Sequence, residues 1–286
     1  MYGPSATSEA TSAATSAAVK VIVEDDAGAL NLNGASISWV DDWPVYLEST
    51  SHWWRVTGLQ IDAATCPRGN AAYVAAGTLA ADFSPQPGMV WQTGAVTVAP
   101  GATLTLQPGT ILKGAGLTIH GWLEAHGTAA RPIMLTVPED DTIGGDTNAD
   151  GDGSLPAAGD RNSILIHGGG AKESTLDHLE LRYGGVSVNG GGKATAEHTE
   201  VRFGGVSFTL SQNFNAAFLA NGGQLTVKNS LVQTANNIGL AVLAGGKLAA
   251  ENVLVANSAL ANVFGDGAGS QAALTNNTLE IGRAHV

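Results

Sequence analysis

The side chains most able to do chemistry are concentrated in one acidic stretch, residues 139–154, near the middle of the chain. Oxygen-bearing side chains occupy alternate positions of this stretch, and Gly151 stands at the sixth position of the run. These side chains are Asp146, Asn148, Asp150 and Asp152. Alternate oxygen ligands with a turn-forming glycine match the first half of an EF-hand-type calcium loop. The sequence therefore predicts a Ca²⁺ site whose role is to order the loop.

The calcium pattern is incomplete at its end. The twelfth position is Ala157, where an EF-hand places a bidentate glutamate. The missing carboxylate could come from Asp160, Asp140 or Asp141. A solvated acidic loop without a bound ion remains the alternative interpretation.

A second polar pattern, His-x-Glu-x-Arg, occurs twice. It places His178 and Arg182 twenty residues before His198 and Arg202. Alternate residues of a strand share one face, so these side chains are expected on the solvent face while the intervening apolar residues face the core. One interpretation is a face on which Arg182 and Arg202 contact carbohydrate. The interpretation that we favour is a ladder of ion pairs, Glu180 with Arg202 or Glu200 with Arg182, worth a few tenths of a kcal/mol per pair.

Aromatic residues give a third candidate site. Five of the six tryptophans lie within residues 19–94, and three of them are close in sequence: Trp43, Trp53 and Trp54. Exposed tryptophans could stack on sugar rings, whereas buried ones would pack as part of a cap. No catalytic residue is assigned, because the chain has no G-x-S-x-G and its seven histidines are scattered.

Internal repeats identify the elements that must position these side chains. Residues 221–232 return as 244–255 with a shift of 23, and residues 177–187 return as 197–207 with a shift of 20. A period of 20 to 25 residues indicates a solenoid, and apolar residues alternate with the period of a strand, as in Leu225 and Val227. The sequence predicts an all-β fold, a parallel β-helix of roughly eight coils over 95–279 with an acidic insertion at 139–160. Asn229, Asn252 and Asn277 are expected at equivalent turns.

Three segments resemble a known group of proteins. Val98 to Gly114, Gly121 to Ile133 and Leu181 to Gly185 resemble repeats of bacterial secreted right-handed β-helix proteins of the pectin-lyase-like superfamily. The resemblance implies a right-handed parallel β-helix in an extracellular or bacterial cell-surface setting. It implies little about activity, because the superfamily includes polysaccharide lyases, hydrolases and adhesins.

The segments outside the repeats have distinct compositions. Residues 1–18 are expected to be a Ser/Thr/Ala-rich tail or linker, and 19–94 a β-rich N-terminal cap or a small β module. Residues 280–286 do not fit the repeat pattern and are interpreted as a sequencing or cloning scar.

Charge and hydrophobicity narrow the function classes. A net charge of −12 argues against nucleic acid as a partner, and no apolar run is long enough for a membrane span. The leading hypothesis is a structural, adhesion or carbohydrate-contacting module, stabilised by calcium, whose partner is a polysaccharide or cell-surface component. The alternative is a carbohydrate-active enzyme, a lyase or hydrolase truncated at its C-terminus. That enzyme would need carboxylates or calcium beside Arg182 or Arg202 in a concave groove.

Overall fold

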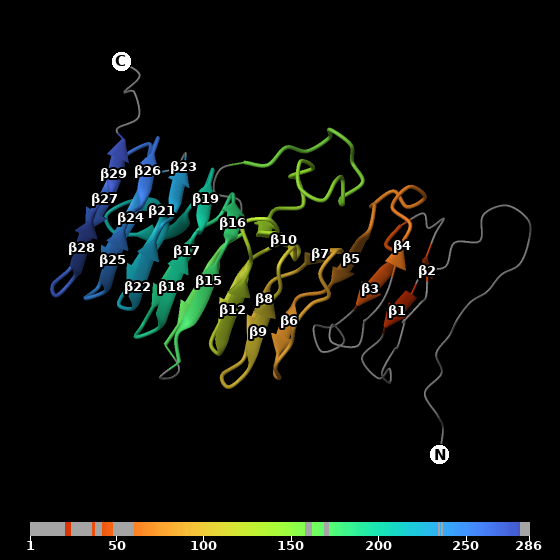
Figure 1. The fold of residues 1–286 in the computed structure, drawn as a ribbon, viewed down its shortest axis with the longest axis horizontal. Coiled ribbons are helices and arrows are strands. Elements are labelled where there is room, and N and C mark those ends of the chain that lie inside the picture. The colour runs from red at the N-terminus through yellow and green to blue at the C-terminus, as the bar shows by residue number, and fades with distance from the viewer. Residues whose placement is uncertain are drawn as a thin grey trace, which may run out of the picture.

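A computed structural model describes residues 21–23, 36–37, 42–47, 60–157, 162–168, 172–233, 235 and 237–280. These residues form a parallel β-solenoid of about nine turns, in which strands stack in rows from β1 at one end to β29 at the other (Figure 1). The described residues contain no helix, which confirms the expected all-β parallel β-helix. None of their segments is a helix of the length and apolar character that a bilayer span requires.

Each regular coil gives one strand to each of three sheets. The eleven-stranded sheet contains β1 (Val21–Val23), β3 (Val45–Leu47), β5 (Ala71–Val74), β7 (Val90–Thr93), β10 (Ile111–Gly114), β13 (Ile133–Thr136), β16 (Leu179–Arg182), β19 (Glu200–Arg202), β23 (Leu231–Gln233), β26 (Leu254–Ala256) and β29 (Thr278–Glu280). The nine-stranded sheet contains β6 (Gly77–Leu79), β8 (Val96–Val98), β11 (Leu117–Ile119), β14 (Ile164–His167), β17 (Val186–Asn189), β20 (Val206–Thr209), β21 (Asn213–Asn221), β24 (Ile238–Leu243) and β27 (Ala261–Gly265). The seven-stranded sheet contains β9 (Thr103–Leu106), β12 (Trp122–His126), β15 (Ser174–Asp177), β18 (Lys193–Glu197), β22 (Gln224–Lys228), β25 (Lys247–Glu251) and β28 (Gln271–Thr275). A separate pair is formed by β2 (Ser36–Ile37) and β4 (Gln60–Ile61).

The core runs along the inside of the three sheets. Inward residues stack directly on their counterparts one coil away, because the strands pair in parallel register. In the seven-stranded sheet large and small side chains alternate along one such row, which lets neighbouring coils interlock. The row is Leu106, Ala125, Leu176, Ala196, Val227 and Ala250. All six are buried, and burial of each leucine contributes about 2 kcal/mol.

A left-handed corner joins the seven-stranded sheet to the eleven-stranded sheet. The residues at this corner have φ between 47° and 53°: His178, His198, Asn229, Asn252 and Asn276. The expected equivalence of Asn229 and Asn252 is therefore confirmed, and the amide Nδ2 of Asn252 donates to Oδ1 of Asn229 at 3.1 Å. The expectation for Asn277 is wrong by one position. Lys247 pairs with Gln271, 24 residues on, so the corner falls at Asn276 instead.

Strands continue from the repeats into residues 19–94. There β3, β5 and β7 pair in parallel register with one another, and β7 pairs with β10. This segment thus stacks on the end of the repeats with the same kind of sheet. The expected tail 1–18 lies outside the described residues, as do residues 281–286 of the expected scar, whereas Glu280 ends β29.

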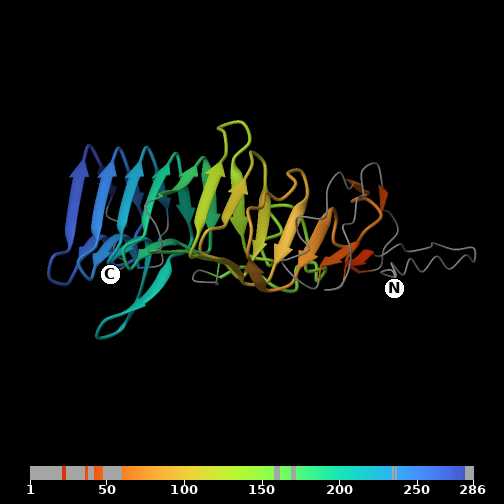
Figure 2. The ribbon, with the colours of Figure 1, turned by 90° about the horizontal axis from the view of Figure 1, so that it is seen from below.

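Two insertions depart from the regular coil. The acidic segment follows β13 and extends back over β10, β7 and β5 (Figure 1). The second insertion is a hairpin in which β20 pairs antiparallel with the first half of β21. It projects from the side of the solenoid (Figure 2). Each insertion covers the outer face of a different sheet.

Candidate functional site

Three basic side chains hold the acidic loop on the outer face of the eleven-stranded sheet. Lys113 Nζ donates to the Gly145 carbonyl at 2.5 Å. The guanidinium of Arg68 donates to the Thr147 carbonyl at 2.8 Å, and that of Arg182 donates to Thr142 Oγ1 at 2.9 Å. The three cations come from different coils, so the loop is fixed along its length rather than at one end.

Asp140 fixes the first turn of this loop. Its side chain is 1% exposed. Its carboxylate accepts hydrogen bonds from Thr136 Oγ1 at 2.7 Å and from the Thr142 backbone amide at 3.2 Å, and lies 3.5 Å from the Arg182 guanidinium. These contacts assign Asp140 to the structure of the loop base. They also place a carboxylate beside Arg182, on the face that carries the arginines.

A cluster of three carboxylates lies above this base: Asp141, Asp146 and Asp150, whose ligand atoms all lie within 4.8 Å of one another. Asp146 shapes the turn, because its carboxylate accepts hydrogen bonds from the backbone amides of Gly151 at 2.8 Å and Asp150 at 3.3 Å. The structure thus brings together two of the predicted ligands. Asp141 is the residue, among the three considered, that joins them.

The other predicted ligands have different positions. The amide Nδ2 of Asn148 donates to Ser154 Oγ at 2.9 Å. Asp152 is exposed and outside the cluster of carboxylates, and Asp160 lies outside the described residues. Within the described residues, Oδ1 of Asn148 and Oδ1 of Asp141 are buried acceptors without a hydrogen-bond donor. A buried acceptor of this kind is costly unless a cation or donor satisfies it.

The loop contains opposing charges that perturb one another. Burial raises the pKa of Asp141, and Asp146 and Asp150 raise it further, while Lys113 lowers it. Burial also lowers the pKa of Lys113, which the neighbouring carboxylates oppose. The cluster can hold a metal ion, which would relieve the repulsion among its carboxylates.

Arg182, which contacts the loop, and Arg202, one coil away, are each paired with carboxylates. Nε of Arg182 lies 2.7 Å from Glu180, and Nε of Arg202 lies 2.6 Å from Glu200 and 3.6 Å from Glu180. The expected diagonal pair between Glu180 and Arg202 is therefore present. The adjacent carboxylate of Glu200 raises the pKa of Arg202 above its usual value. Contact of either arginine with sugar stays a prediction.

The histidines of the repeated pattern do not share this face. His178 and His198 each precede a strand, with φ of 48° at the left-handed corner. Their Nδ1 atoms lie 2.8 Å and 3.0 Å from Oδ1 of Asp177, at the end of β15. The expectation of one continuous polar strand face is therefore wrong, because the chain turns between each histidine and the glutamate that follows it.

Trp43 packs at the N-terminal end of the solenoid. It is 8% exposed, its ring centroid lies 5.4 Å from that of Tyr73, and Cζ of Arg68 lies 4.4 Å from its centroid. These are the contacts of a packed aromatic residue. Trp53 and Trp54 lie outside the described residues, and the role of all three in carbohydrate binding stays a prediction.

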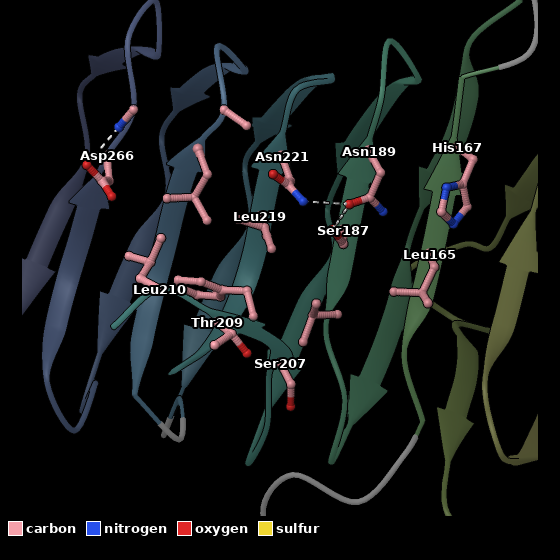
Figure 3. A pocket seen from close by; sticks show the side chains of 15 residues that line it. Leu165, His167, Ser187, Asn189, Ser207, Thr209, Leu210, Leu219, Asn221 and Asp266 are labelled. Atoms are coloured by element: carbon pink, nitrogen blue, oxygen red, sulfur yellow. Dashed lines mark hydrogen bonds between the residues drawn. The ribbon is translucent and has the colours of Figure 1, made fainter. Parts of the chain in front are cut away.

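A groove lies elsewhere, between the β20–β21 hairpin and the outer face of the nine-stranded sheet (Figure 3). This groove has a volume of about 610 Å³. Its polar lining consists of His167, Ser187, Asn189, Ser207, Thr209, Asn221 and Asp266. Its apolar lining includes Leu165, Phe208, Leu210, Leu219 and Leu243. The groove therefore offers an apolar surface beside a row of hydrogen-bonding groups.

An aromatic cluster supports the hairpin. The rings of Phe208 and Phe214 stack with centroids 5.6 Å apart, and Phe264 of β27 lies 6.0 Å from Phe214. Val206 and Phe208 pack with Leu219 in an apolar cluster outside the main core. The hairpin is consequently anchored by burial of apolar side chains, so the groove beneath it has a defined shape.

The polar row follows the ends of successive strands. His167 of β14 and Asn189 of β17 are paired in register. Nδ2 of Asn221, from β21, donates to Oδ1 of Asn189 at 3.2 Å, and Ser187 Oγ donates to the same oxygen at 3.0 Å (Figure 3). Burial lowers the pKa of His167, as does His120, whose ring lies 4.8 Å away. This row is thus uncharged at neutral pH along most of its length.

The groove was not predicted from the sequence, although the lengths of the coils contain a signal for it. Glu180 pairs with Glu200, twenty residues on, whereas Glu200 pairs with Leu231, 31 residues on. The additional residues form alternating polar and apolar positions on either side of a bend at 210–212. An overlong coil with two such segments indicates an inserted hairpin.

Comparisons with known proteins concern the fold. No protein-family model matches the chain, and no curated protein matches it. Among solved structures it is similar to the catalytic domain of a GH87 alpha-1,3-glucanase in complex with tetrasaccharides, at 13% sequence identity and a TM-score of 0.35. The match covers 90% of this chain, which spans 62% of that chain. At this level the likeness is one of β-helical architecture alone.

Proposed function

We propose that this chain is a rigid β-solenoid module that binds a polysaccharide in the groove beneath the β20–β21 hairpin. The observation that carries the proposal is the combination of an apolar wall with a regular row of amides and hydroxyls. Sugars present hydrophobic C–H faces and hydroxyl edges, and such ligands suit grooves with apolar walls and a few placed polar groups. The row crosses several coils, about 4.8 Å apart, so a linear chain could contact it repeatedly.

The small number of carboxylates in the groove lining agrees with binding without cleavage. Glycoside hydrolysis ordinarily requires a pair of carboxyl groups flanking the bond. Among the groove-lining residues that the structure describes, Asp266 is the single carboxylate. Of the carboxylates beside Arg182, Asp140 is buried in the loop base and Glu180 is paired with the arginine. We therefore favour a binding or adhesion role, in a secreted or cell-surface protein, over the carbohydrate-active enzyme.

We also propose that Ca²⁺ occupies the acidic loop and orders it over the sheet. The proposal is supported by the three clustered carboxylates and by the buried, unpaired Oδ1 of Asp141. Calcium binding to chelator-treated protein, measured by calorimetry, should disappear when Asp146 and Asp150 are both changed to Asn. The matched control, Asp152→Asn, should retain binding because Asp152 is outside the cluster. Equal loss in both variants would contradict the assignment.

The polysaccharide proposal is tested by affinity electrophoresis on a panel of neutral and acidic polysaccharides. The double variant Asn189→Ala/Asn221→Ala should weaken binding tenfold or more, since it removes two amides that line the groove. The control Asn229→Gly changes an asparagine at the opposite corner, where φ is 47°, and should keep the wild-type affinity. The proposal is wrong if no polysaccharide is retarded or if the double variant binds like the control.

A further inference from the structure

A second cluster of ligating groups lies outside the groove lining, at the left-handed corner between the seven-stranded and eleven-stranded sheets. It consists of Asp177, His178 and His198, whose ligand atoms all lie within 4.8 Å of one another. Both imidazole Nδ1 atoms approach the same carboxylate oxygen, Oδ1 of Asp177, at 2.8 Å and 3.0 Å. The two rings stack with centroids 4.4 Å apart. Neither the proposed polysaccharide site nor the acidic loop uses these residues.

The choice of residue at this corner changes along the solenoid. Asparagine occupies the left-handed position in the coils of Asn229, Asn252 and Asn276, and asparagine is a residue that tolerates this conformation well. Histidine replaces asparagine in the two preceding coils. His178 directly follows Asp177 in the sequence, and His198 lies at the same corner one coil later. The replacement brings two imidazoles into one stack beside a carboxylate. The corner itself requires no imidazole, because asparagine forms it in the later coils.

Two distances within this cluster are close to those between the ligand atoms of a tetrahedral metal site. Metal–nitrogen bonds of 2.0–2.1 Å at tetrahedral angles separate the ligand atoms by roughly 3.3 Å. The observed separations from the carboxylate oxygen, 2.8 Å and 3.0 Å, approach this value. In addition, Nδ1 of His178 is a buried atom without an aligned hydrogen-bond partner. The nearest carboxylate of the next coil, Glu197, instead accepts a hydrogen bond from Asn229 at 3.1 Å.

We propose that this corner binds Zn²⁺ through Nδ1 of His178, Nδ1 of His198 and the carboxylate of Asp177. Two imidazoles and a carboxylate are ligands that suit zinc, whereas calcium prefers a shell of oxygen ligands. Side-chain exposure of 26%, 44% and 37% for His178, His198 and Asp177 leaves the ion access to solvent, so water completes its coordination. The bound ion joins two adjacent coils, because His178 and His198 belong to successive turns.

The test is a zinc titration of untagged, chelator-treated protein by calorimetry. One Zn²⁺ should bind per chain at this corner, and the variant His178→Asn/His198→Asn should bind it at least a hundredfold more weakly. Asparagine is the residue that the same corner carries in later coils, so this variant should keep the circular dichroism spectrum and melting temperature of the metal-free wild type. Asp177→Asn provides a second variant, which should also weaken zinc binding.

A control separates this site from the acidic loop. The variant Asp146→Asn/Asp150→Asn should keep the zinc affinity of the corner, and excess Ca²⁺ should not displace the zinc. Co²⁺ used as a spectroscopic probe should give the visible absorption of a tetrahedral site in the wild type but not in the double histidine variant. Absence of zinc binding in the wild type, or unchanged binding in the double histidine variant, would overturn the proposal.

Discussion

Replacement of Lys113 by methionine should weaken the attachment of the acidic loop to the sheet. Lys113 is fully buried on the outer face of β10, and its ammonium donates to the Gly145 carbonyl at 2.5 Å. Methionine fills a similar volume with an unbranched side chain but provides neither the charge nor the donor. The substitution therefore removes one of the three cationic contacts while leaving the strand intact.

The magnitude follows from two opposing effects. A hydrogen bond from a charged donor is worth about 1.5–3 kcal/mol, and its loss favours opening of the loop. Relief from burying an ammonium group offsets part of this loss. A net cost of about 1–2 kcal/mol raises the population of the open loop by roughly 5- to 30-fold.

Calcium affinity should change in the opposite direction. Lys113 lies close enough to Asp141 to lower its pKa, so its positive charge also opposes a bound cation. Removal of one unit charge a few ångströms from the site is worth about 1 kcal/mol in bulk water and about 4 kcal/mol near a protein surface, so calcium affinity should rise at least roughly fivefold. The variant thus combines a looser metal-free loop with tighter calcium binding.

Hydrogen exchange of residues 138–157 and calcium calorimetry measure the two effects. Exchange in the metal-free Lys113→Met variant should be faster than in the wild type, and saturating calcium should restore protection. Lys193→Met, on the seven-stranded sheet, is the control and should change neither measurement. Slower exchange, or weaker calcium binding in Lys113→Met, would refute the electrostatic reasoning.

Three further predictions concern other parts of the solenoid. Burial and Asp146 raise the pKa of Asp141. The protonated carboxyl therefore stabilises the loop at low pH, and this contribution is lost as the pH rises through the raised pKa. Calcium affinity measured by calorimetry should increase over the same window, above pH 3.8. A pH-independent affinity there would contradict this assignment. Asn252→Ala should lower the free energy of unfolding in denaturant by about 1 kcal/mol, because alanine is strained at a φ of 53°, while Asn252→Gly should cost less; equal losses would argue against strain. Arg182→Gln should speed proteolysis within 138–157, because Arg182 contacts Thr142, whereas Arg202→Gln should not; equal cleavage of both variants would disprove the anchoring role.

The repeats predicted the solenoid because each coil packs only against its neighbouring coils. Each coil buries alternating residues such as Leu225 and Val227 against the same positions of its neighbours, so the pattern recurs in the sequence. The error at Asn277 came from a coil that is one residue longer, a change that sequence similarity between adjacent coils does not reveal. Fold class was therefore predictable, and the exact register was less so.

The candidate sites were less predictable, because they depend on contacts between coils. Asp146 and Asp150 were identified from their spacing, but Asp141 joined them only through the path of the loop. His178 and His198 were assigned to a strand face because strand alternation does not show where the chain enters a left-handed corner. The groove arises from a hairpin that folds over a distant part of the sheet. Sequence spacing alone does not locate such a contact.

The position of a bound saccharide tests the central proposal most directly. The experiment is a nuclear magnetic resonance titration of labelled protein with an oligosaccharide of whichever polysaccharide binds most tightly. The side-chain amides of Asn189 and Asn221 should shift in proportion to saturation, while the guanidinium signals of Arg182 and Arg202 remain unchanged. Shifts confined to the arginine face, with none at the two asparagines, would contradict the assignment of the groove as the carbohydrate site.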